Sequence, residues 1–145
     1  MKMWFLEREP CPPVDPELQS AVLLCIDDDA YVLECEKSFL ESFGYTVLTA
    51  ASGGKGLELA SMHSVDLVIV DYFMPEMNGQ EVAMEMRRLR PQAPIIMLSG
   101  AVDLPEPVLK WADAFIAKDN LASQLLPMIS QLHGSGSTAL SSYDA

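Results

Sequence analysis

Residues 66–75 read DLVIVDYFMP, a short apolar run that closes on a carboxylate. Four consecutive apolar residues, three of them β-branched, are typical of a strand buried on both faces of a parallel sheet. The run ends at Asp71, and Pro75 and the turn pair Asn78-Gly79 follow it. A charge is costly to bury unless it lies at the mouth of the strand, in water or next to a cation. Because open α/β sheets carry their chemistry at such strand ends, Asp71 is the candidate reactive residue.

The rest of the chain repeats this alternation of buried strand and helix. Apolar and β-branched runs predict strands at 21–26, 45–50, 67–70, 94–98 and 114–117. Helical spacing of apolar residues predicts helices at about 30–43, 53–63, 79–90, 105–112 and 120–133. The apolar face expected on the first helix consists of Val32, Cys35, Phe39, Leu40 and Phe43. Every connection is long enough for a crossover, which predicts one α/β domain with a doubly wound, five-stranded parallel sheet and helices on both faces.

Composition and length favour one globular domain with irregular ends. Half of the 145 residues are hydrophobic, and we expect the domain at 21–133, a Pro-rich extension at 1–20 and a flexible Gly/Ser-rich tail at 134–145. No apolar run is long enough to span a membrane, and the first residues do not form a secretory signal. Three cysteines without metal-ligand spacing indicate a reduced, cytoplasmic protein. The net charge of -12 disfavours direct nucleic-acid binding.

Four of the predicted strands end on polar residues, namely 27–29 (three aspartates), Asp71, Ser99 and Lys118. The carboxyl ends of parallel strands lie on one edge of the sheet, so these residues should meet. Two unit charges about 4 Å apart interact by roughly 4 kcal/mol at an effective dielectric near 20, so clustered carboxylates need a cation. Oxygen ligands at a solvated edge suit Mg²⁺, with Mn²⁺ as an alternative, and the lack of His or Cys argues against zinc.

With a metal and Lys118 supplying positive charge, this edge can hold a phosphoryl group on Asp71. Ser99 offers a hydroxyl donor and Lys118 an ammonium to the phosphoryl oxygens. Taken singly, each residue has an ordinary explanation, such as a solvated helix start, a loop carboxylate or a surface side chain. Their occurrence at the same end of separate strands is what indicates a site.

These residues also resemble a known family. Over about residues 21–133 the chain is similar to the receiver domain of two-component response regulators, in a stand-alone form like the chemotaxis receivers. The motifs that carry the resemblance are LCIDDD at 24–29, DLVIVDYFMPEMNG at 66–79, PIIMLSG at 94–100, and Lys118. The resemblance implies a flavodoxin-like fold with strand order 2-1-3-4-5.

The resemblance further implies how the site would be used. Asp71 would accept a phosphoryl group from a phosphohistidine on a histidine kinase or phosphotransfer protein, with Mg²⁺ bound. Asp28, Asp71 and the backbone carbonyl of Phe73 would be metal ligands, and Asp27 would act through metal-bound water.

Ser99 and Phe115 would form the family's switch pair, which reshapes a face that a downstream protein reads. The chain would then be no enzyme beyond self-phosphorylation and autodephosphorylation.

Three departures from the family pattern carry expectations of their own. Asp119 follows Lys118 where the family usually has proline; a cis bond there would cost about 2.5–4 kcal/mol, so we expect a trans bond and a relaxed loop. Phe73 and Ala101 cannot orient an attacking water, which predicts slow hydrolysis of phosphorylated Asp71. The short interval between Ser99 and Lys118 predicts a trimmed fourth helix.

Two competing functions are also compatible with the sequence. A degenerate receiver could act as a constitutive protein-binding module, a reading that rests on Asp119 alone. A Mg²⁺-dependent phosphatase with Asp71 as nucleophile would typically carry a second Asp two residues later, where this chain has Phe73.

Overall fold

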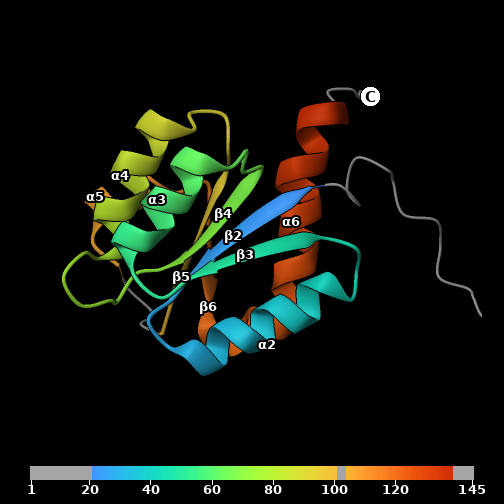
Figure 1. Ribbon diagram of the computed structural model, residues 1–145, viewed down its shortest axis with the longest axis horizontal. Coiled ribbons are helices and arrows are strands. Elements are labelled where there is room, and N and C mark those ends of the chain that lie inside the picture. Colours follow the sequence, from blue (N-terminus) through green and yellow to red (C-terminus); the bar gives the residue numbers. More distant parts are fainter. Residues whose placement is uncertain (1–20, 101–103, 139–145) are drawn as a thin grey trace, which may run out of the picture.

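The computed structural model describes residues 21–100 and 104–138, with side chains as far as His133. The expected extension at 1–20 lies outside the described residues. The described chain forms one sheet of five parallel strands, in the order β3-β2-β4-β5-β6 (Figure 1). The strands are β2 (Val22–Ile26), β3 (Thr46–Ala50), β4 (Leu67–Asp71), β5 (Ile95–Ser99) and β6 (Ala114–Ala117). The predicted doubly wound sheet and its 2-1-3-4-5 order are confirmed.

The helices follow the strands as predicted, with differences near the carboxyl end. They are α2 (Ala30–Glu41), α3 (Gly53–Met62), α4 (Gly79–Leu89), α5 (Glu106–Leu109) and α6 (Leu121–Thr138), with a 3-10 turn η1 (Lys118–Asn120) before α6. Helix α5 has four residues and is shorter than the predicted 105–112, in line with the trimmed helix expected from the short interval between Ser99 and Lys118. Helix α6 ends at Thr138, so the predicted tail at 134–145 overlaps its last turn. No helix in the described ranges is long and apolar enough to cross a membrane.

Helices cover both faces of the sheet, α2 and α6 on one side and α3, α4 and α5 on the other (Figure 1). Successive side chains of β2 point to opposite faces of the sheet. Leu23 and Cys25 belong to the hydrophobic cluster under α2 and α6, whereas Leu24 and Ile26 belong to the cluster under α3, α4 and α5. We call these sides the α2/α6 face and the α3–α5 face. The central strand β4 is buried throughout, which fits a strand covered on both faces.

On the α3–α5 face, α3 approaches α4 and α4 approaches the end of β4 closely enough to require glycine. A Cβ on Gly53 would lie 2.6 Å from Val82 Cγ2 of α4. A Cβ on Gly79 would lie 2.7 Å from the Cα of Tyr72 and 2.9 Å from the carbonyl oxygen of Asp71. Close packing on this face therefore depends on residues without side chains.

The predicted apolar face of α2 was partly wrong. The helix buries Leu33, Glu36 and Leu40 against the sheet, while Cys35 and Phe43 are exposed. The apolar surface of α2 is wider than the part that the sheet covers, so only one edge of it reaches the core. The other edge, which includes Val32 and Phe39, is half-buried and lines a space toward α6.

Candidate functional site

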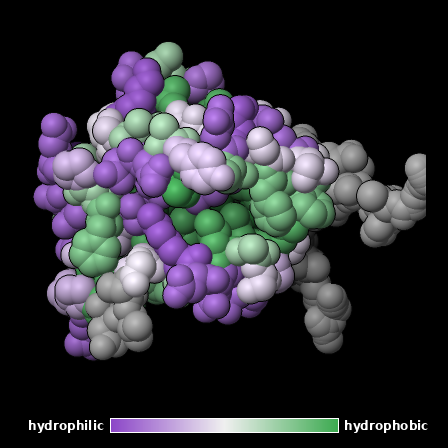
Figure 2. All heavy atoms as spheres, turned by 90° about the horizontal axis from the view of Figure 1, so that it is seen from below, coloured by the Kyte–Doolittle hydropathy of each residue, from purple (hydrophilic) through white to green (hydrophobic). Residues whose placement is uncertain are grey.

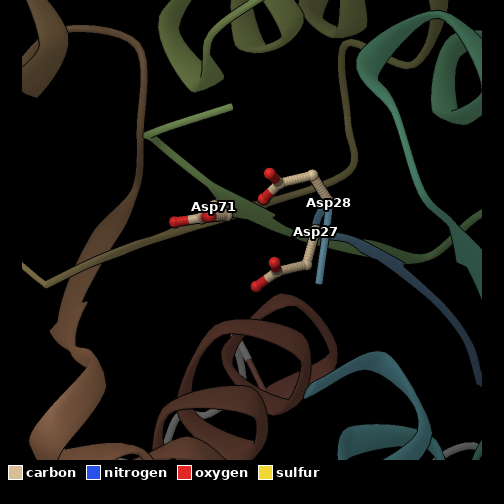
Figure 3. Close-up of side chains that lie close together, drawn as sticks. All are labelled: Asp27, Asp28 and Asp71. Carbon is tan, nitrogen blue, oxygen red and sulfur yellow. The ribbon is translucent and has the colours of Figure 1, made fainter. Parts of the chain in front are cut away.

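Three aspartates from two strand ends converge at the carboxyl edge of the sheet (Figure 3). Asp27 and Asp28 directly follow β2, and Asp71 is the last residue of β4. One carboxylate oxygen from each lies within 4.8 Å of the others. Asp27 and Asp71 are only 1% and 3% exposed, whereas Asp28 is open to solvent. The structure thus brings together the carboxylates that the parallel topology predicted.

Lys118 reaches this cluster from the end of β6. Its ammonium nitrogen lies 3.2 Å from Asp27 Oδ2 and 3.2 Å from Asp71 Oδ2. Since the described residues contain no cis peptide bond, the bond to Asp119 is trans, as expected. The substitution of Asp119 for the family's usual proline therefore does not turn Lys118 away from Asp71.

The oxygens of Asp27 and Asp71 differ in what they contact. Asp27 Oδ1 accepts a hydrogen bond from the backbone N–H of Asp29 at 2.9 Å, and its Oδ2 faces Lys118. Asp71 Oδ2 also faces Lys118, but its buried Oδ1 has no hydrogen-bond partner. An unpartnered buried carboxylate oxygen is costly, so Asp71 Oδ1 is the atom of this cluster that most needs a ligand.

The charges in the cluster do not balance. Burial, and next the charge of Asp27, raise the pKa of Asp71 above its usual value, although Lys118 opposes the shift. Burial alone would lower the pKa of Lys118, but the charges of Asp71 and Asp27 raise it above its usual value. Three carboxylates against one ammonium leave a formal charge of 3 − 1 = 2 negative units. That excess, with oxygen-only ligands at a solvated edge, fits a divalent cation.

The loop after Asp71 is held by the start of α4. Asn78 is the N-cap of this helix: its side chain accepts from the backbone N–H of Glu81, whose carboxylate in turn accepts from the N–H of Asn78. The N–H of Gly79 donates to the carbonyl oxygen of Tyr72 at 2.8 Å. The capped helix therefore fixes the backbone immediately beyond Asp71.

The remaining predicted residues lie around the aspartate cluster in different positions. Ser99 is the buried last residue of β5, one step beyond Leu98, which pairs with Asp71 in the sheet register. Phe115 is the second residue of β6 and packs, half-buried, against the core of the α3–α5 face. The side chain of Phe73 is 56% exposed and contacts Tyr72 edge to face. Ala101 lies outside the described residues.

One ionisable residue beside the cluster was missed by sequence reasoning. Glu36 on α2 is 4% exposed; its carboxylate is hydrogen-bonded with the thiol of Cys25, and its Oε2 has no partner. Burial, and next the charge of Asp27, raise the pKa of Glu36 to about 7. The spacing Leu33, Glu36, Leu40 is helical, but α2 also carries apolar residues on the neighbouring face, so the spacing did not single out Glu36 as buried.

Comparison with known proteins agrees with this architecture. The model of the response regulator receiver domain matches residues 23–130. A receiver domain protein structure from Clostridium thermocellum is 31% identical, with a TM-score of 0.73 over 81% of this chain and 97% of that one. The response regulator TrrA from Thermotoga maritima, solved in complex with Mg²⁺-BeF, is 31% identical with a TM-score of 0.70, covering 77% of this chain and 98% of TrrA.

Curated relatives are longer proteins. The transcriptional regulatory protein GlrR of Escherichia coli is 40% identical over 88 residues, which is 61% of this chain and 20% of GlrR. The response regulator SaeR of Staphylococcus aureus is 28% identical over 113 residues, which is 76% of this chain and 49% of SaeR. The chain therefore spans half or less of the length of these two relatives.

Proposed function

The chain belongs to the response regulator receiver family, and from that premise we propose that Asp71 accepts a phosphoryl group from a phosphohistidine of a histidine kinase or phosphotransfer protein. The observation that carries the proposal is the buried Asp71 carboxylate, 3.2 Å from Lys118 and beside Asp27 and Asp28. In the reaction, an oxygen of Asp71 bonds to phosphorus while the phosphorus–nitrogen bond of the donor breaks and the imidazole keeps the electron pair.

Mg²⁺ is the cation proposed for this edge, with Mn²⁺ as an alternative. Asp28, Asp71 and the backbone carbonyl of Phe73 would hold it, and Asp27 would contact it through water. Asp71 Oδ1 supports this assignment because it is buried without a partner, and both oxygens of Asp27 already accept hydrogen bonds. When bound, the ion neutralises charge on the phosphoryl oxygens.

Three residues around Asp71 have separate roles toward the phosphoryl group. Lys118 supplies a fixed positive charge at the acceptor, since the ammonium already lies against Asp71. Ser99 would donate its hydroxyl to a phosphoryl oxygen, and Phe115 would move with it as the switch pair. The resulting change in the sheet edge would be read by a downstream protein.

Loading the chain with acetyl phosphate and Mg²⁺ tests this proposal. We expect intact-mass spectrometry to find one added phosphoryl group, which is lost in Asp71→Asn and when EDTA removes the metal. Asp29→Asn is the matched control: Asp29 neighbours the cluster, but it caps α2 through the backbone N–H groups of Tyr31 and Val32, and asparagine caps equally well. Unchanged loading of Asp71→Asn would contradict the assignment.

Beryllofluoride with Mg²⁺ separates this function from the alternatives. A working receiver should give a saturable change in tryptophan fluorescence that disappears in Asp71→Asn. A degenerate receiver would give no such change. That alternative was based on Asp119 alone, and Lys118 nevertheless lies against Asp71. The family match is to a receiver domain and not to a catalytic enzyme, which leaves the phosphatase alternative without support.

Hydrolysis of the phosphorylated residue should be slow. The exposed Phe73 side chain has no polar atom with which to orient water beside Asp71. Phosphate release after removal of acetyl phosphate measures this directly, and complete decay within seconds would contradict it. Phe73→Asn, which restores a polar group at that position, should accelerate the decay.

A further inference from the structure

The polar groups around Asp71 suit a phosphoryl group, but none of them matches the imidazole ring from which it would be transferred. Asp28 and Lys118 are charged, and Ser99 offers a hydroxyl. An aromatic side chain lies at the same edge of the sheet. Phe73 follows Asp71 by two residues, so their Cα atoms are at most about 7 Å apart. Its ring is therefore within reach of a donor that is bound at Asp71.

Phe73 is exposed, but exposure alone does not identify a contact site. Hydrophilic and hydrophobic residues are mixed over the face drawn in Figure 2, and single exposed apolar side chains are common in proteins. Phe43 is a comparable residue, because it is 48% exposed, against 56% for Phe73, and it contacts Phe39 edge to face. Phe43 lies three residues before β3 begins, at the amino edge of the sheet, and thus opposite Asp71. What distinguishes Phe73 is its place beside the acceptor.

The ring of Phe73 is held by its neighbour. The ring centroids of Tyr72 and Phe73 are 4.7 Å apart at an interplanar angle of 83°, and Tyr72 packs, half-buried, against the core of the α3–α5 face. The backbone of Tyr72 is fixed as well, since its N–H donates to the carbonyl oxygen of Leu98 at 2.9 Å and its carbonyl oxygen accepts from the N–H of Gly79 at 2.8 Å. A ring held in this way loses little freedom when a second ring packs against it.

We propose that Phe73 is a specificity-determining residue of the acceptor site: its ring packs against the imidazole of the phosphohistidine donor and favours donors whose phosphorus is bonded to an aromatic nitrogen. This inference rests on the function proposed for Asp71. In an in-line transfer the imidazole lies on the side of phosphorus opposite the attacking oxygen of Asp71, and therefore toward solvent, because Asp71 itself is buried. Aromatic rings that pack in offset or edge-to-face geometry attract each other beyond the area they bury.

Three small phosphoryl donors separate the effect of the ring from that of the bond that breaks. Phosphoimidazole has a phosphorus–nitrogen bond and an aromatic ring, phosphoramidate has a phosphorus–nitrogen bond without a ring, and acetyl phosphate has neither. Phe73→Leu keeps an apolar side chain but removes the ring. It should lower the initial rate of loading by phosphoimidazole roughly two- to tenfold, the worth of one aromatic pair, and change the rates with the other two donors by less than about twofold.

Two variants serve as controls, with initial rates followed by intact-mass spectrometry in the presence of Mg²⁺. Phe73→Tyr keeps the ring and should retain the preference of the parent chain for phosphoimidazole. Phe43→Leu makes the same substitution in an exposed phenylalanine at the opposite edge of the sheet and should leave all three rates unchanged. Titration with beryllofluoride and Mg²⁺ should give the parent midpoint in every variant, which shows that the acceptor site is intact.

Equal losses with phosphoimidazole and phosphoramidate in Phe73→Leu would overturn the proposal, because the side chain would then act on the acceptor loop and not on the ring of the donor. Loss of the preference in Phe73→Tyr, or the same loss in Phe43→Leu, would also overturn it. Failure of the parent chain to load from any of the three donors is a separate result. It would contradict the acceptor function of Asp71 and this inference with it.

Discussion

The two faces of the sheet are packed in different ways. On the α3–α5 face Gly53 and Gly79 leave no room for a Cβ, and the residues that α3, α4 and α5 bury are all glycine or apolar. On the α2/α6 face a glutamate is buried against the sheet and a pocket separates the helices. The α3–α5 face is therefore close-packed and apolar, whereas the α2/α6 face has a buried charge and a pocket next to the strand ends that carry Asp71. Substitutions on the two faces should therefore have different consequences.

The largest difference is expected from core truncations in matched helices. Met86→Ala on α4 removes a fully buried side chain from the close-packed face and should cost toward the upper end of about 2–5 kcal/mol in the free energy of unfolding. Leu125→Ala on α6 removes a side chain that already borders the pocket, so it loses fewer contacts and should cost toward the lower end. Urea denaturation measures both. Equal losses would mean that the pocket wall is as tightly packed as the opposite core.

Glu36→Gln should stabilise the α2/α6 face in a pH-dependent way. Because the pKa of Glu36 is raised from 4.5 to about 7, its contribution favours folding below pH 4.5 and is lost as the pH rises through 7. Glutamine is neutral at every pH, so the variant should be up to about 3 kcal/mol more stable than the parent at pH 8, and less than about 1 kcal/mol at pH 5.

Urea denaturation in EDTA at the two pH values checks this prediction. Glu34→Gln is the control, because Glu34 lies on the same helix but is exposed. A gain at pH 8 that persists undiminished at pH 5 would show that Glu36 is not the titrating group.

Gly79→Ala tests the close packing of the opposite face where it meets Asp71. The added Cβ would meet the backbone of Tyr72 and Asp71, which cannot move as a side chain can, so we expect a loss of about 1–3 kcal/mol and weaker phosphoryl loading. Gly54→Ala is the control, because a Cβ there meets nothing within 4 Å, and it should be neutral or stabilise α3 by up to about 1 kcal/mol. If both variants behaved alike, close approach of α4 to the sheet would not position the acceptor loop.

The sequence predicted the carboxyl edge of the sheet better than it predicted the α2/α6 face, for physical reasons. The strand-end aspartates could be placed together because parallel topology puts Asp27 and Asp71 on one edge regardless of detail. The side of α2 that faces the sheet could not be predicted, because the apolar surface of this helix covers more than one face and tertiary packing decides which part meets the sheet. Glu36 was missed for the same reason. The pocket depends on the spacing of two helices far apart in sequence, which no local pattern encodes.

The smallest effect is expected from Asp119, the residue that departs most visibly from the family pattern. Asp119→Asn removes an exposed charge beside the pocket, and surface substitutions of this kind usually change stability by no more than about 0.5 kcal/mol. Lys118 is already held between Asp27 and Asp71, so removing a third, solvated carboxylate should only modestly accelerate loading by acetyl phosphate. The gain should vanish in 1 M salt, where the Debye length is about 3 Å. A large gain in the loading rate that persists in 1 M salt would contradict this prediction. It would mean that Asp119 changes the position of Lys118, so that the loop after β6 positions the ammonium more than the strand ends do.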